Sequence, residues 1–260
     1  MANANTIEGL TELDLSLRDE LYCIADAKLV LAGWYMLVLR NGRSIADFTS
    51  ICAMMQGQYG HARAIYQHIG QFGVTREEVE WTRGAKDIRS PKMLDRPPQS
   101  WSDFIAAIFM AEQAISTQLA AFKSIETDKI LARLAAKILK ESRFHLSYSI
   151  GWIKALRKDP ASTIDEDARR RLVETLNWWG NADQPDMLFS NGFRGSSDAD
   201  IRERFLELVR ETFDIPDEIA HRAKTGLKSW QRSIRRDGAP GIPEALFQKI
   251  SFKNHELALP

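Results

Sequence analysis

The sequence has 260 residues, of which 44% are hydrophobic and 27% are charged, and its 35 Lys and Arg side chains are balanced by 35 Asp and Glu. This composition is typical of a folded globular protein and excludes a disordered or low-complexity chain. The zero formal charge argues against general binding to nucleic acid or to an anionic membrane. We therefore expect a folded chain with a sizeable hydrophobic core and neither of those partners.

The N-terminal region and the apolar segments predict a cytoplasmic protein. Residues 1–14 are polar and acidic, without the basic and apolar regions of a secretory signal. The longest apolar run, residues 29–39, is much shorter than the ~20 residues that span a bilayer. The two cysteines, Cys23 and Cys52, lie in apolar helical patterns, which is typical of reduced and buried thiols.

Helical periodicity predicts four long helices, at residues 16–40, 44 to 70 or 73, 101–123 and 127–156. Asn41-Gly42 ends the first helix, and only a short break separates the third from the fourth, so we expect two antiparallel hairpins. Between the hairpins lie a short helix that begins near Thr75 and a crossover loop at residues 90–100, which contains Pro91, Pro97 and Pro98. This organisation is typical of a ferritin-like four-helix bundle.

Further helices are expected after the bundle. One begins at Ser162 and runs toward Trp179, and two more are expected at residues 198–213 and 217–236. We interpret residues 1–260 as one all-α domain. Its bundle core spans about residues 16–157, its peripheral helices about 162–238, and its C-terminal tail 239–260.

Two of the long helices contain altered versions of a metal-binding pattern. Bundles of this type hold two irons with one carboxylate from each of two helices and a Glu-x-x-His pair from each of the other two. Residues three or four apart share a helix face, so a carboxylate and an imidazole at that spacing can bind one metal. On the second helix His61 is preceded at this spacing by Gln58, an amide. On the fourth helix His145 is preceded by Ser142, with a carboxylate only one residue earlier, at Glu141.

The other two long helices place one anion and one cation at the same level. Glu112 lies on the third helix, whereas Lys28 on the first stands where a carboxylate ligand is expected. Two glutamates offset little of the charge of two divalent ions, and unpaired buried ions cost several kcal/mol. We therefore expect the Lys28 ammonium to occupy the cavity and to bind both Glu112 and Glu141. The predicted degenerate metal cavity comprises Lys28, Gln58, His61, Glu112, Glu141, Ser142 and His145.

The same positions carry a family resemblance. The motifs are Gln-Tyr-Gly-His-Ala at residues 58–62, Ser-Trp-Ser-Asp at 100–103 and Lys-Glu-Ser-Arg-Phe-His at 140–145. In this order they resemble the large subunits of the phenylacetyl-CoA epoxidase (phenylacetic acid catabolic) system, over about residues 21–179. The resemblance implies a comparison with a catalytic subunit that has Asp-Glu-x-Gly-His and Lys-Glu-Glu-x-x-His motifs, whose liganding glutamates are replaced here. It also implies a paired structural subunit of the same fold without a working metal site, which this chain resembles more closely.

The leading hypothesis is therefore a structural subunit of a ring-epoxidising oxygenase of phenylacetate catabolism, with no cofactor of its own. Its expected partner is a homologous iron-bearing catalytic subunit, with a homodimer and contacts to the acyl-CoA substrate as further options. The alternative is a metal-dependent oxygenase that holds iron with a reduced ligand set, namely His61, Glu112, Glu141 and His145. A third option is a homo-oligomeric binding protein that uses the cavity for a small ligand.

Several residues also have ordinary interpretations. A lone helix histidine is commonly a core or surface group, Lys28 has a stem long enough to reach the surface, and Glu141 fits a solvated charged face. His68 lies on the same face as His61 and is a weaker candidate. A basic run near the C-terminus consists of Arg222, Lys224, Lys228, Arg232, Arg235 and Arg236. It fits a solvated helix face, and it also fits a binding site for the phosphates of coenzyme A or for an acidic partner.

Overall fold

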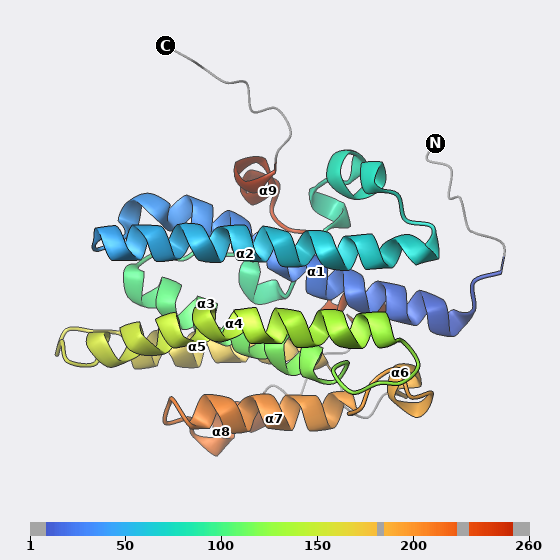
Figure 1. Ribbon diagram of the computed structural model, residues 1–260. Helices are drawn as coiled ribbons and strands as arrows, with labels where there is room; N and C mark the ends of the chain where they lie inside the picture. The colour runs from blue at the N-terminus through green and yellow to red at the C-terminus, as the bar shows by residue number, and fades with distance from the viewer. Residues whose placement is uncertain (1–8, 181–184, 223–228, 252–260) are drawn as a thin grey trace, which may run out of the picture.

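Four long helices form the body of the protein. The computed structural model describes residues 9–180, 185–222 and 229–251, without the side chains of residues 220–222. The long helices are α1 (Glu12–Val38), α2 (Ile45–Ile69), α3 (Trp101–Ala120) and α4 (Lys129–Leu156). They form the hairpins α1–α2 and α3–α4, and α2 also packs against α4 (Figure 1). The all-α, ferritin-like bundle predicted from the sequence is confirmed.

Side-chain caps determine where these helices begin. Ser44 and Ser100 each accept a hydrogen bond from the backbone three residues ahead, and Asp128 does the same at the start of α4. The first helix begins earlier than the predicted residue 16, because Thr11 and Asp14 form a reciprocal capping box. This signal was missed in the polar N-terminal stretch.

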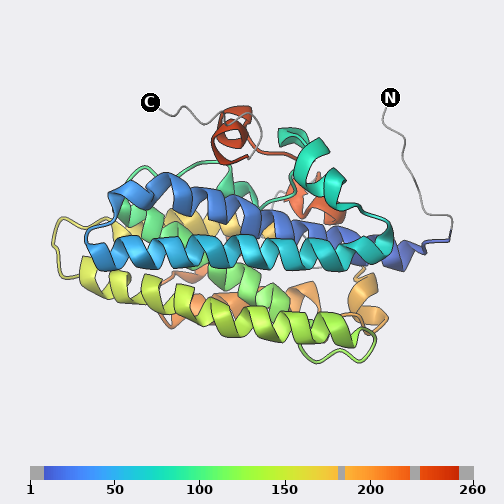
Figure 2. The same ribbon diagram turned by 45° about the horizontal axis from the view of Figure 1, so that its top comes forward.

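The two hairpins each contribute one central and one outer helix. α1 and α3 are buried on nearly all sides, whereas α2 and α4 bury one stripe and expose the rest. Figure 2 shows α2 and α4 side by side on one face of the bundle. The helical segment Glu12–Asn41, which is α1 followed by η1 (Leu39–Asn41), is long and apolar enough to cross a membrane. However, 78% of its most apolar window is buried inside the protein, which is the environment of a core helix.

The crossover between the hairpins contains short helical turns instead of a regular helix. The helix predicted near Thr75 is largely a π-helical turn, η3 (Glu78–Thr82). The remaining turns are η2 (Gly70–Phe72), η4 (Ala85–Asp87) and η5 (Lys92–Leu94). Gly73 adopts φ 82°, a left-handed conformation that glycine reaches without strain, and so ends the extension of α2.

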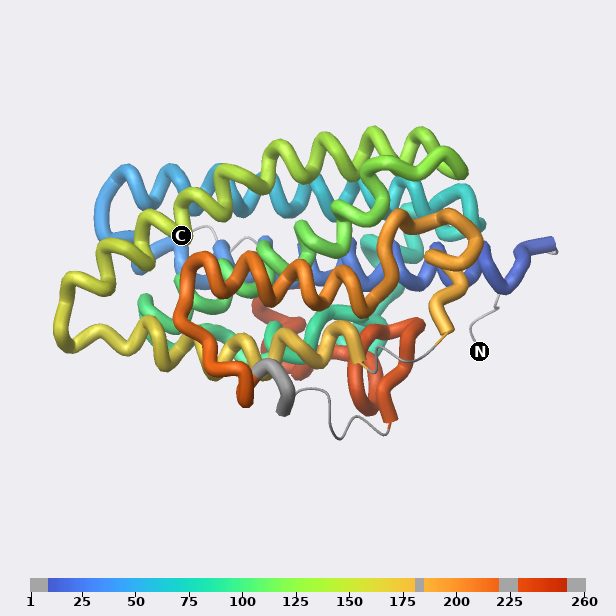
Figure 3. Tube along the Cα trace, turned by 90° about the horizontal axis from the view of Figure 1, so that it is seen from below, coloured from blue at the N-terminus to red at the C-terminus, as the bar shows by residue number. Residues whose placement is uncertain are grey.

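Smaller helices cover the α3 side of the bundle. They are α5 (Ile164–Leu176), η6 (Asn177–Trp179), α6 (Met187–Ser190), α7 (Asp198–Arg210) and α8 (Asp217–Arg222). α5 and α7 both pack against α3, and Figure 3 shows α7 running along the bundle when it is viewed from below.

The predicted helix at residues 217–236 is wrong in its second half. After α8, and beyond residues 223–228, which lie outside the described ranges, the chain forms a β-hairpin. The hairpin consists of β1 (Trp230–Gln231), η7 (Arg232–Ile234) and β2 (Arg236–Asp237). Part of the predicted C-terminal tail is also helical, because α9 (Glu244–Ile250) packs against α1. Gly33 permits this contact, since a Cβ there would lie 2.5 Å from Ile250 Cβ.

Ion pairs hold the last three arginines of the basic run, Arg232, Arg235 and Arg236, in the hairpin. Arg235 donates to Glu20 Oε2 at 2.6 Å and to Asp198 Oδ1 at 2.8 Å, and all three side chains are buried. Arg232 also pairs with Asp198, and Arg236 pairs with Asp95. These three arginines are therefore engaged in ion pairs with carboxylates and do not form a solvated, phosphate-binding helix face. The side chains of Arg222, Lys224 and Lys228 lie outside the described part of the chain.

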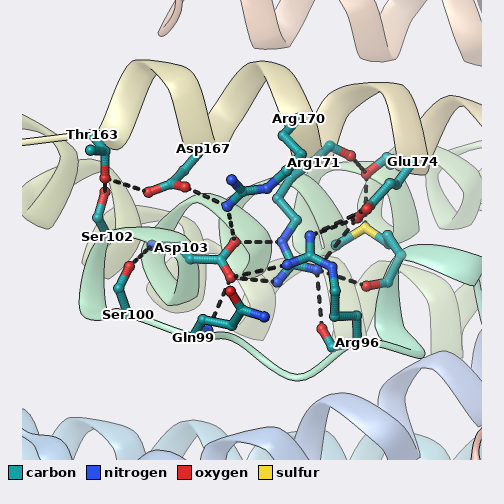
Figure 4. Close-up of polar contacts among 12 residues, drawn as sticks. Arg96, Gln99, Ser100, Ser102, Asp103, Thr163, Asp167, Arg170, Arg171 and Glu174 are labelled. Carbon is teal, nitrogen blue, oxygen red and sulfur yellow. Dashed lines mark hydrogen bonds and ion pairs between the residues drawn. The ribbon is translucent and has the colours of Figure 1, made fainter.

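A second buried ion-pair cluster joins α5 to the bundle (Figure 4). Asp103 in the first turn of α3 accepts hydrogen bonds from Nε of Arg171 at 2.7 Å and from Nη2 at 2.8 Å. The same guanidinium donates to the carbonyl oxygens of Met93 and Arg96, so its buried charge is well satisfied. Burial alone raises the pKa of Asp103, but Arg171 outweighs it and leaves this pKa below its ordinary value. The Ser-Trp-Ser-Asp motif at residues 100–103 thus has a structural role, because its Asp103 links α3 to α5.

Candidate functional site

The predicted site residues meet inside the bundle, and every long helix contributes at least one. α1 provides Lys28, α3 provides Glu112, and the other five come from α2 and α4. Glu141 has a side chain that is 47% exposed. The other six residues are at most 4% exposed, and these are Lys28, Gln58, His61, Glu112, Ser142 and His145.

Lys28 and Glu112 form the centre of this cluster. Nζ of Lys28 lies 3.1 Å from Oε2 of Glu112 and donates a second hydrogen bond to Oγ of Ser142 at 3.3 Å. The other carboxylate oxygen of Glu112 accepts a hydrogen bond from Nε2 of Gln58 and lies 2.8 Å from Nδ1 of His145. Lys28 is completely buried, so its side chain does not extend to the surface.

Glu141 does not bind Lys28, contrary to the prediction from the sequence. Its carboxylate lies 2.7 Å from Nε2 of His61 and is half exposed. The helix geometry explains the difference, because Ser142 and His145 belong to the buried stripe of α4 and Glu141 lies one residue outside it. Lys28 therefore links Glu112 to Ser142, while Glu141 and His61 form a separate contact near the surface.

The charges of the cluster are balanced around the buried carboxylate. Burial acts to raise the pKa of Glu112, but the charge of Lys28, together with His145, outweighs it and lowers this pKa to about 2. For His61, burial and the nearby charge of Lys28 lower the pKa to about 4, against the opposing hydrogen bond to Glu141. Glu112 is thus ionised at neutral pH, with its carboxylate 3.1 Å from Nζ of Lys28, and His61 is neutral.

These residues do not fit a di-iron centre. Three positions at which a carboxylate is expected carry an ammonium, an amide and a hydroxyl, at Lys28, Gln58 and Ser142. Lys28 is already the counter-ion of Glu112, and its positive charge opposes a second cation at the same carboxylate. Within residues 9–180, 185–222 and 229–251, no group of three or more His, Cys, Asp or Glu is placed to hold a metal ion.

The remaining histidines have other places in the structure. His68 does not reach the cluster, because its Nε2 lies 2.8 Å from Asp128 and connects α2 to the start of α4. The side chain of His221 and all of His255 lie outside the described ranges.

One neighbour of the cluster was missed in the sequence. The ring of Tyr35 lies edge-on to the imidazole of His145, with a centroid distance of 6.2 Å, and is completely buried. Tyr35 follows Lys28 by two helical turns and so shares its face of α1, which is the signal that identifies it. Its hydroxyl, Oε1 of Gln58 and Nδ1 of His61 are buried polar atoms that have no hydrogen-bond partner among the described residues.

Comparison with known proteins identifies the family. Residues 9–214 match the sequence model of the family described as phenylacetic acid catabolic protein, a range that contains all four long helices. The chain is similar to one of the subunits of 1,2-phenylacetyl-CoA epoxidase from Escherichia coli (strain K12), with 25% identity over 182 residues. That alignment covers 65% of this chain and 72% of the relative. The resemblance first suggested by the three motifs is confirmed, and the chain belongs to the phenylacetic acid catabolic protein family.

Proposed function

We propose that this protein is a structural, non-catalytic subunit of a phenylacetyl-CoA epoxidase-like oxygenase in phenylacetate catabolism, and that it acts in the cytoplasm. The observation that carries the proposal is the Lys28 ammonium, 3.1 Å from Glu112 in the middle of the bundle. The relative that the chain resembles is named as one subunit of an epoxidase, which supports a role within an assembly.

In this proposal the buried cluster is a degenerate di-iron site whose remaining side chains stabilise the bundle. A buried carboxylate needs a compensating cation, and Lys28 supplies it from within the chain. Gln58 and His145 then bind the other oxygen of Glu112. These contacts connect all four long helices, and we expect the subunit to hold no cofactor of its own.

The proposed partner is a homologous iron-bearing catalytic subunit, and α2 and α4 offer a surface for it. The two helices lie side by side in Figure 2. Their exposed large hydrophobic side chains are Ile45, Phe48, Ile130 and Phe144. These side chains are spread along the helix pair, because α2 and α4 are antiparallel and Ile45 and Ile130 each lie at the start of their helix. Exposed aromatic groups such as Phe48 and Phe144 are enriched at protein interfaces. We call these four residues the α2–α4 surface.

Co-expression with a homologue from the same genome that retains both Glu-x-x-His motifs tests this function. We expect a stable complex in which iron remains with the homologue, and we expect Phe144→Glu to weaken it because the change places a charge on the α2–α4 surface. Phe189→Glu is the matched control, since Phe189 is similarly exposed but lies on α6. A chain that never binds the homologue, or a complex in which iron is held by this chain, would contradict the proposal.

A further inference from the structure

A second feature lies on the side of α2 that faces η3 and α9. There the protein has a cavity of about 770 Å³, with walls contributed by α1, α2, η3 and α9. This volume is in the range of ordinary small-molecule sites. None of the seven residues of the buried cluster lines it. It is therefore a separate candidate site, which the proposed structural role does not use.

The walls of the cavity are mainly apolar. Four aromatic side chains contribute to the lining: Tyr59 and Tyr66 from α2, Trp81 from η3 and Phe247 from α9, of which Trp81 is exposed. Aliphatic side chains complete it, and these include Leu29, Val30, Val74, Val79 and Ile250. Such a lining favours a ligand with an apolar body.

A buried carboxylate, that of Asp26, holds the lining residues Tyr66 and Arg83 in position. Asp26 is completely buried and accepts hydrogen bonds from the hydroxyl of Tyr66, from the guanidinium of Arg83 and from the backbone N–H of Arg89. Arg83 also stacks over the ring of Tyr22 at 5.0 Å. These interactions hold two lining residues in place, so the cavity is formed before any ligand binds.

The charges of the lining favour an anion. Arg83 is paired with Asp26, and Nε of Arg76 lies 2.9 Å from Glu80. The third lining arginine, Arg63, is exposed on α2 and has no carboxylate within ion-pair distance in the described part of the chain. Among the described residues, Arg63 is thus the lining arginine that is exposed to solvent without a carboxylate partner. The buried hydroxyl of Ser251, which also lines the cavity, has no hydrogen-bond partner among the described residues.

We propose that this cavity binds a small amphipathic anion, such as a medium-chain or aryl carboxylate. The apolar body lies between α1, η3 and α9, and the anionic group pairs with the guanidinium of Arg63. The inference is independent of the proposed structural role, because it uses a different set of residues.

The test is a fluorescence titration of the full-length protein with 1-anilinonaphthalene-8-sulfonate, an aromatic anion that brightens in apolar sites. We expect one saturable site per chain, from which decanoate displaces the dye and decyltrimethylammonium does not, both below their micelle concentrations. Absence of saturable binding would overturn the proposal, and so would equal displacement by the anionic and the cationic amphiphile.

Three variants assign the binding to this cavity. Arg63→Ala should weaken dye and decanoate about tenfold, which corresponds to about 1.4 kcal/mol. Val79→Trp should abolish binding by filling the cavity, and Val74→Trp replaces it if that variant does not fold. Arg169→Ala, at an exposed arginine on α5 that does not line the cavity, should bind like the parent. Titrations that are unchanged in the Arg63 and tryptophan variants would overturn the assignment.

Discussion

Replacement of Lys28 by Met is expected to lower the free energy of unfolding by about 3–5 kcal/mol, the usual cost of removing one partner from a buried ion pair. The change leaves the carboxylate of Glu112, which is 1% exposed, without its ammonium counter-ion. It also removes the donor to Ser142. Urea unfolding of the parent and the variant measures the difference.

The loss should be larger at pH 8 than at pH 5.5. In the parent, the pKa of Glu112 is about 2, below its ordinary value of 4.5. The ionised carboxylate therefore stabilises the fold at pH values above 4.5, and this stabilisation is lost as pH falls toward 2. Without Lys28, burial raises the pKa of Glu112 instead. The folded variant then binds more protons than the unfolded chain, and its stability decreases as pH rises through the raised pKa.

A matched control separates this effect from a general loss of lysine charge. Lys140→Met changes an exposed lysine on α4, so we expect a change within about 0.5 kcal/mol at both pH values. A Lys28→Met protein as stable as the parent at pH 5.5 and at pH 8 would show that the buried ion pair does not support the fold.

The combined change of Lys28→Glu, Gln58→Glu and Ser142→Glu is expected to create a ferrous-iron site. It replaces one cation and two neutral side chains with carboxylates, next to Glu112 and the two histidines of the cluster, His61 and His145. Two Glu-x-x-His pairs and two further carboxylates then face the same interior, which is the ligand set of a di-iron bundle. Anaerobic titration with ferrous iron measures the binding, and iron should raise the melting temperature of the triple variant by mass action.

The gain should be strongly non-additive. The double variant Gln58→Glu with Ser142→Glu is the informative control, because it adds both carboxylates and keeps the ammonium of Lys28. We expect it to bind little iron, since the cation still occupies the centre of the cluster. A well-folded triple variant that takes up no iron would contradict the assignment of these positions as former ligand sites.

Local patterns predicted much of the bundle. Apolar spacing and caps such as Ser44 and Ser100 specify helices within a few residues of sequence, so the four long helices were found with their order and pairing. The same periodicity placed Lys28, Glu112 and His145 at one level. It did not separate Glu141 from Ser142, because adjacent residues on a helix differ by about a quarter turn and the burial of α4 decides which faces inward.

Features that depend on distant parts of the chain were not predicted. The hairpin at residues 229–237 is stabilised by buried ion pairs of Arg235 with Glu20 and Asp198, which lie far from it in sequence. The ion pair between Asp103 and Arg171 likewise joins separate elements, and so do the residues that line the cavity near Trp81. No local pattern reports such contacts, and the composition of residues 217–236 alone favours a helix.

The most direct test of the central claim is the iron content of the wild-type protein. The chain should be produced in iron-supplemented medium, purified without chelators and measured by elemental analysis, with the triple variant as a positive control. An ammonium at the centre and the loss of carboxylates at Gln58 and Ser142 predict well under one iron per chain. A content close to two irons per chain would contradict the account, and about one iron would favour the reduced ligand set instead.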